Sequence, residues 1–153
     1  MRLSENHALP VPPPAAWAAL NDLAVLRDAL PGCESLIEIA RDEFVGEIAV
    51  PLGPVTSRFT LHILRRDVDA PRACTLRFET CSTSASGIGE AALCLDPADA
   101  GATTLQADIA VDVEGLLGTL GAPAIELAAR RMAGEFFARL GAAALARAAR
   151  AAA

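Results

Sequence analysis

The sequence predicts an α+β fold in which a curved antiparallel sheet of about seven strands wraps around one long C-terminal helix. Three observations predict it. Segments with alternating apolar and polar residues fill most of the chain before Gly121, and the apolar spacing becomes helical after it. Proline and capping residues between Pro12 and Gly32 indicate two short helices after the first strand. A chain of 153 residues fits a single domain, which we place at residues 1–145, with an Ala/Arg-rich helix end or frayed tail at 146–153.

The N-terminal elements follow from local signals. Leu3 to Leu9 has the pattern of a strand, and Pro14 can open a helix because the first turn does not need its missing N–H. Asn21 and Asp22 are suited to ending that helix and capping a second one, which runs roughly from Leu23 to Leu30. A Pro-Gly dipeptide then stops the second helix.

The middle of the chain alternates as half-buried strands do, so each strand has one dry face and one wet face. We expect strands at 35–40, 44–50, 58–64, 74–79, 91–95 and 103–113. The segment Ser86-Gly87-Ile88-Gly89 lacks the strand-to-helix context of a phosphate cradle, and it indicates a bend or bulge in the sheet. After Gly121, one apolar stripe follows helical spacing through Ile125, Ala129, Met132, Phe136 and Leu140.

A strongly bent sheet held against one helix leaves space that side chains of modest size do not fill. Alanine, glycine and cysteine are abundant at the expected inward positions, and large aromatic residues are few. We therefore predict an apolar cavity, with a fully packed core as the alternative. The predicted lining residues are Phe59, Leu61, Leu76, Phe78, Ile109, Ala129, Met132 and Phe136. Glu90, which shares a face with Ile88, is the candidate polar contact.

Composition narrows the classes of partner. The net charge of −6 and pI near 4.8 oppose nucleic acid, because binding to a phosphate backbone needs clustered positive charge. Although 53% of the residues are hydrophobic, no apolar run approaches the roughly 20 residues of a membrane span. The N-terminus also lacks the apolar core of a secretory signal, so we expect a cytoplasmic protein.

Motifs for catalysis or metal binding are not visible. Neither His7 nor His62 has a convincing catalytic partner in the sequence. The four cysteines form no C-x-x-C pair and have no histidine at ligand spacing, so we interpret them as buried small hydrophobes. We accordingly expect no catalytic residue, no metal and no cofactor.

Several strings resemble one family. They are Ala18-Ala19-Leu20-Asn21-Asp22, Leu26, Pro31-Gly32-Cys33-Glu34-Ser35-Leu36, Gly53-Pro54-Val55, Arg58-Phe59 and Glu135-Phe136-Phe137-Ala138-Arg139-Leu140. In this order and spacing they resemble the CoxG-like family of carbon monoxide dehydrogenase subunits. That family is a branch of the START-like (SRPBCC) helix-grip superfamily, and the resemblance covers nearly the whole chain.

The resemblance implies a non-enzymatic binding or carrier protein for a hydrophobic small molecule, lipid or quinone-like. It also implies an accessory role to a molybdenum-containing carbon monoxide dehydrogenase or related hydroxylase complex. Contact with the inner face of the membrane would be transient at most, and the sequence assigns no oligomeric state. Two alternatives stay open: an enzyme similar to polyketide cyclases and aromatases that uses the same cavity, and an interaction module without a ligand.

Overall fold

The computed structural model describes residues 1–52, 54–83, 85–115 and 121–152. Gly53, quoted above in a family string, lies outside the described residues. The elements in chain order are β1 (Arg2–Leu9), α1 (Pro13–Leu20), α2 (Leu23–Ala29), β2 (Cys33–Ala40), β3 (Glu43–Leu52), β4 (Val55–Asp69), β5 (Ala73–Cys81), β6 (Ala85–Pro97), a short 3-10 turn (Asp99–Gly101), β7 (Thr103–Gly115) and α3 (Ala122–Ala152). The predicted order of elements is confirmed.

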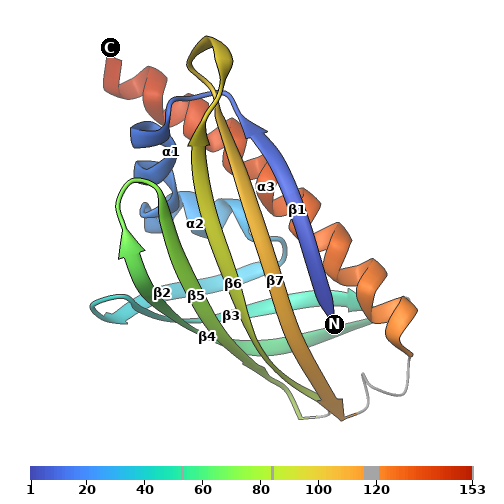
Figure 1. Ribbon diagram of the computed structural model, residues 1–153. Helices are drawn as coiled ribbons and strands as arrows, with labels where there is room; N and C mark the ends of the chain where they lie inside the picture. The colour runs from blue at the N-terminus through green and yellow to red at the C-terminus, as the bar shows by residue number, and fades with distance from the viewer. Residues whose placement is uncertain (53, 84, 116–120, 153) are drawn as a thin grey trace.

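One antiparallel sheet of seven strands has the order β1-β7-β6-β5-β4-β3-β2. The first strand therefore pairs with the last, and α1 and α2 carry the chain from one edge of the sheet to the other. Figure 1 shows the sheet curving around α3, with α1 and α2 beside the C-terminal part of that helix. The predicted α+β class, with a curved sheet around one long helix, is confirmed.

The turn between α1 and α2 forms as its residue types dictate. Asn21 ends α1, and its side-chain amide donates to the Trp17 carbonyl at 2.8 Å. Asp22 caps α2, because its Oδ1 accepts from the backbone N–H groups of Ala24 and Val25 at 3.0 and 3.4 Å. This turn fixes the direction of α2 and places both helices over one end of the concave face of the sheet.

Of the bend or bulge predicted at Ser86–Gly89, the bulge is wrong. Strand β6 pairs with β5 and β7 without a register shift, and the strand begins at Ala85. Gly89 allows a close approach across the sheet: a Cβ there would lie 2.6 Å from Cζ of Phe78 and 2.5 Å from the carbonyl oxygen of Ala110. The glycine makes room for an aromatic ring on the neighbouring strand while the ladder stays intact.

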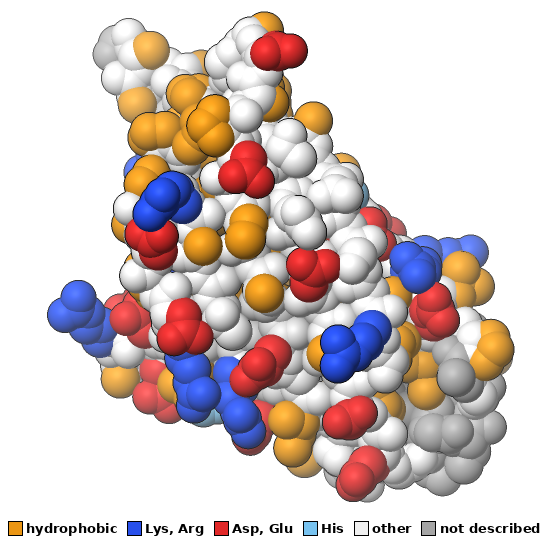
Figure 2. Space-filling view, viewed as in Figure 1, with side chains coloured by type: hydrophobic (Ala, Val, Ile, Leu, Met, Phe, Trp, Pro, Cys, Tyr) orange, Lys and Arg blue, Asp and Glu red, His pale blue; other side chains and the backbone are white. Residues whose placement is uncertain are grey.

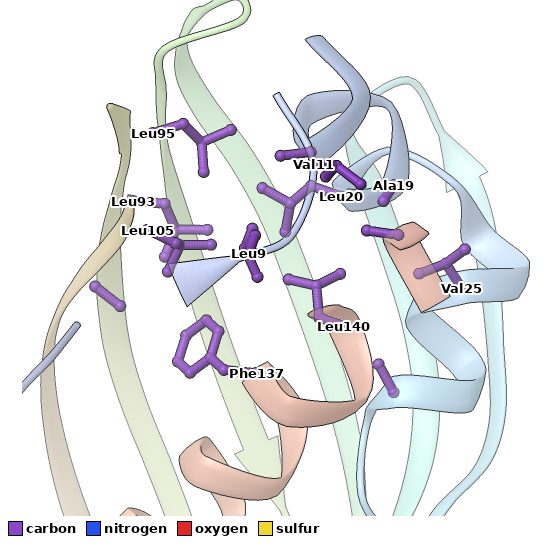
Figure 3. Close-up of a cluster of buried hydrophobic side chains, with 14 of the residues drawn as sticks. Leu9, Val11, Ala19, Leu20, Val25, Leu93, Leu95, Leu105, Phe137 and Leu140 are labelled. Carbon is purple, nitrogen blue, oxygen red and sulfur yellow. The ribbon is translucent and has the colours of Figure 1, made fainter. Parts of the chain in front are cut away.

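Most of the closely packed core lies where α1, α2 and the C-terminal half of α3 meet β1, β6 and β7. Leu9, Leu105 and Leu140 are fully buried there, and Figure 3 shows them pointing into one cluster. A smaller buried cluster lies further along the sheet and comprises Ile48, Val50, Phe59, Leu61 and Ala85. Side chains of Phe78 and Met132 pack against this second cluster without being fully buried.

Helix α3 continues to Ala152. Arg147 Nε donates to Asp22 Oδ2 at 3.1 Å, which joins this last part of α3 to the start of α2. Ala148 packs against the larger cluster one residue later. Residues beyond 145 thus contact the body of the domain.

Candidate functional site: an apolar cavity under the sheet

A cavity of about 400 Å³ lies between the sheet and α3. Every strand and all three helices contribute to its wall, which is almost entirely apolar. This volume falls within the range of cavities that hold small ligands in proteins, about 300 to 1,000 Å³. The space arises because the sheet curves away from the N-terminal half of α3, where Ala128, Ala129 and Ala133 face the sheet.

All eight apolar residues predicted to line a cavity contribute to this wall. They are Phe59, Leu61, Leu76, Phe78, Ile109, Ala129, Met132 and Phe136. Register explains why they meet: Ile63 lies opposite Phe78, and Ala91 lies opposite both Leu76 and Ile109, so their side chains share the concave face. Ligand binding by these residues remains a prediction.

Glu90 does not contact the cavity, so its assignment as a polar contact is wrong. Its side chain lies on the convex face of the sheet, with Oε1 3.8 Å from Nη1 of Arg77. On β6 the inward positions are the buried Gly89 and Ala91, and Glu90 alternates with them together with the exposed Ile88. Figure 2 shows acidic and basic side chains scattered over this outer face.

Several wall residues were missed by the sequence analysis. The two short helices and the residues that follow each of them contribute Trp17, Leu20, Asn21, Leu26 and Leu30. Periodicity within one segment cannot show this contact, because it depends on how the helix pair docks on a sheet that comes later in the chain.

Arg65 and Cys74 were missed as wall residues as well, although a signal was present for both. Arg65 continues the inward alternation of Phe59, Leu61 and Ile63 by one more step. Cys74 begins the inward alternation of β5, and burial raises the pKa of its thiol. The thiol is therefore protonated at neutral pH.

Arg65 is the charged side chain among the described residues of the wall. Its Nε donates to Asp42 Oδ1 at 2.9 Å, and an Nη1 hydrogen bond reaches Asn21 Oδ1. The guanidinium carbon lies 5.2 Å from the ring centroid of Phe44, within the range of a cation–π contact. The hydroxyl-bearing wall residues, Thr80 and Ser86, lie further along the sheet.

The histidines lie away from the cavity. His62 Nε2 is 2.7 Å from Glu43 Oε1, and His7 stacks on Phe137 with ring centroids 4.5 Å apart. Neither histidine belongs to the described cavity wall. Two cysteines, Cys81 and Cys94, are exposed, so their interpretation as buried hydrophobes is wrong.

Within the described ranges, no group of three or more His, Cys, Asp or Glu side chains is arranged to hold a metal ion. None of the helices in those ranges is long and apolar enough to cross a membrane.

The family model for CoxG, a subunit of carbon monoxide dehydrogenase, matches residues 7–145. The chain belongs to the CoxG family. The match runs from His7, near the end of β1, to Leu145 on α3, and so includes strands β2 to β7 in full. No curated protein matches the chain by sequence.

Solved structures with the same fold extend over nearly the whole chain. A conserved protein from Geobacillus kaustophilus is 19% identical, with 95% of each chain covered and a TM-score of 0.90. A START superfamily protein from Mycobacterium smegmatis is 11% identical, with 94% of this chain and 96% of that chain covered and a TM-score of 0.73. The Zhui aromatase/cyclase from a Streptomyces species is 15% identical, with 97% and 95% covered and a TM-score of 0.68. These likenesses show the START-like helix-grip fold, and family and fold together identify a hydrophobic-ligand-binding fold.

Proposed function

We propose that this CoxG family member is a carrier that holds a lipid or quinone-like molecule in its cavity and does not convert it. The observation that carries the proposal is the apolar cavity of about 400 Å³ between α3 and the sheet. Moving apolar surface of a ligand out of water contributes about 25 cal/mol per Å², so a molecule that fills this space binds without many polar contacts. Shielding such a molecule from water is what transport through the cytoplasm requires.

The chemistry of the wall supports binding without conversion. General acid–base or nucleophilic catalysis needs a group that can exchange a proton or attack the ligand near neutral pH. The Arg65 guanidinium has N–H donors and no acceptor, and the raised pKa of the Cys74 thiol makes it a weak nucleophile. The remaining polar side chains of the described wall, Asn21, Thr80 and Ser86, have no histidine or carboxylate beside them in that wall.

The partner we propose is a molybdenum-containing carbon monoxide dehydrogenase or a related oxidoreductase. Membership of the CoxG family supports this proposal, because the family is named for that enzyme. A quinone-like cargo would suit such a partner, since an oxidoreductase needs an electron acceptor. We place this exchange in the cytoplasm, at the inner face of the membrane, with transient contact by the carrier.

A second candidate is an enzyme of the cyclase or aromatase type. The shared fold with the Zhui aromatase/cyclase favours it, because the likeness extends over 95% of that protein's chain. The carrier and enzyme proposals differ in one measurable outcome, which is whether the bound compound leaves the cavity chemically changed.

Trp17 provides the measurement because its side chain lines the cavity. We expect titration with decylubiquinone to change Trp17 fluorescence and to saturate at one molecule per chain. Ala129→Phe should weaken this binding by about tenfold or more, since the new ring occupies cavity volume. The matched control is Ala138→Phe, at an exposed position of the same helix, which should leave binding unchanged.

Three outcomes would contradict the carrier proposal. Equal effects of the two substitutions would show that the compound binds outside the cavity. An absence of saturable binding to this or other apolar compounds would leave the interaction module as the better interpretation. Mass spectrometry of the extracted compound would favour the enzyme if it found a converted product.

A further inference from the structure

The inward face of β4 changes character at one residue. Phe59, Leu61 and Ile63 are apolar, and the next inward position is Arg65. The Arg65 side chain is only 11% exposed. Removing a charge from water is costly unless the group is paired and hydrogen-bonded, so a guanidinium facing an apolar cavity needs partners.

The protein supplies part of that partnership. Asp42 accepts from Nε, and Asn21 accepts from Nη1. A guanidinium has five N–H groups, and these two acceptors use two of them. The other three make no hydrogen bond to a described residue, while the ring of Phe44 covers one side of the group. Arg65 is thus held in place at the cavity wall with N–H groups available to donate to a ligand.

We propose that Arg65 anchors the polar end of the ligand by donating to an acceptor oxygen, a carbonyl or a carboxylate. This inference rests on the proposed carrier function and specifies its ligand class: an amphipathic molecule with an oxygen-bearing head and an apolar body. Hydrogen bonds from an ionised donor are about twice as strong as neutral ones, and the low polarity around Arg65 preserves that strength. Asp42 and Asn21 hold the guanidinium in a fixed orientation before the ligand arrives.

Strand register gives the direction and length of the ligand. Arg65 lies opposite Leu76 on β5, and Thr80 lies four residues further along that strand. A strand rises about 3.3 Å per residue, so the backbone of Thr80 lies about 13 Å along β5 from that of Leu76. Leu76 and Phe78 form an apolar floor along this stretch. The apolar body of the ligand lies along it, with its head under the turn between α1 and α2.

A purely structural role for Arg65 predicts a different result. In that case the guanidinium only joins Asp42, in the turn between β2 and β3, to Asn21, in the turn between α1 and α2. Loss of the side chain would then loosen the cavity and weaken every ligand alike. If Arg65 anchors the ligand, loss of its side chain weakens the binding of only those ligands that carry an acceptor oxygen. The dependence of the affinity loss on the head group therefore separates the two roles.

The experiment compares three probes on the purified protein. N-phenyl-1-naphthylamine has no oxygen, and its binding is titrated directly by its fluorescence. The second probe, 2-tridecanone, carries a neutral carbonyl, and the third, tridecanoate, carries a carboxylate. The affinity of each of these two is measured by its displacement of the naphthylamine. In Arg65→Met we expect the naphthylamine affinity to stay within about twofold, while at least one oxygen-bearing probe loses about tenfold or more. The probe with the larger loss identifies whether the head group is neutral or anionic.

Arg66→Met is the matched control, because Arg66 is the next residue and its side chain is exposed. It should leave the affinities for all three probes unchanged. Thermal unfolding checks that Arg65→Met is folded, and Arg65→Lys provides a second variant that keeps a charged donor at the site. Arg65→Lys should recover part of the lost affinity for the oxygen-bearing probe.

The inference is overturned if Arg65→Met weakens the three probes equally, if it weakens none of them, or if Arg66→Met has the same effect. These results differ from a failure of the carrier proposal. Should wild-type protein bind no apolar probe, the proposed function itself is wrong. Binding of all probes without any dependence on Arg65 leaves the carrier in place and removes only the anchor.

Discussion

The two halves of α3 pack differently against the same sheet. Its C-terminal half, from Phe137 to Ala148, lies in the large buried cluster with α1 and α2, whereas Met132, Ala133 and Phe136 are only partly buried and face the cavity. Phe136 and Phe137 lie at the boundary between the two halves, and both line the cavity. Phe137 is 5% exposed and stacks on His7, while Phe136 meets the edge of Phe137 with ring centroids 5.1 Å apart. One apolar stripe thus supplies stability at one end and ligand space at the other.

The reason for the difference lies in what covers each half. Helices α1 and α2 add a layer against the C-terminal half, and the ion pair between Asp22 and Arg147 fixes that layer. The N-terminal half is joined to the sheet at its margin, where Nη1 of Arg130 lies 3.6 Å from Oε1 of Glu5 on β1. The cavity is therefore compatible with a stable fold, because close packing is concentrated around the C-terminal half of α3.

Truncating one large side chain in each half gives the largest expected contrast. Leu140 is fully buried, so Leu140→Ala should lower the free energy of unfolding by about 2 to 5 kcal/mol through lost contacts and a new cavity. Met132→Ala only enlarges an existing space and should cost about 2 kcal/mol or less. Urea denaturation measures both variants. Equal losses would show that the two halves are packed to the same density.

A glycine on the cavity side gives an intermediate effect. In Gly89→Ala the new Cβ would meet both the Phe78 ring and the backbone oxygen of Ala110, so we expect a loss of about 1 to 3 kcal/mol in unfolding free energy. Gly134→Ala is the control, since its Cβ would meet nothing within 4 Å and alanine favours a helix by about 1 kcal/mol. In both thermal and urea unfolding, Gly89→Ala should therefore be less stable than wild type and Gly134→Ala more stable. A stabilising Gly89→Ala would show that the ring moves aside freely.

The contrast between Gly89 and Glu90 also shows where prediction from sequence ends. Alternation on β4, β5 and β7 identified the inward faces correctly, because apolar residues occupy one face and polar residues the other. On β6 the apolar Ile88 is outward and two inward positions are glycine, so the alternation does not show which face is inward. A shift of the assignment by one residue exchanges the inward and outward side chains. Local signals also predicted the cap at Asp22.

What sequence could not supply was contact between distant segments. Arg65 is anchored by residues 23 and 44 positions away, Asp42 and Asn21, and neither pairing has a local signature. The cavity followed from reasoning about curvature, since periodicity gives the face of each strand but not how far the sheet bends away from the helix. Packing of α1 and α2 decides which end of that space is filled.

The smallest expected effect concerns the ion pair at the closely packed end. The hydrogen bond from Arg147 lowers the pKa of the Asp22 carboxyl below its usual 3.8, and the backbone bonds of the helix cap act in the same direction. A lowered pKa in the folded state contributes stability above the unfolded pKa, and that contribution is lost as pH falls through the folded pKa. Because both side chains are about one-third exposed, solvent limits the ion pair to about 1 kcal/mol or less.

Asp22→Asn isolates this contribution, since asparagine caps a helix about as well as aspartate and carries no charge. We expect wild type to be more stable than the variant at pH 6, with the difference closing as pH falls below about 4. Urea unfolding across this pH series measures it, and Asp28→Asn, at an exposed position of the same helix, serves as the control. A difference as large at pH 3 as at pH 6 would mean that the carboxylate charge does not hold α3 to α2.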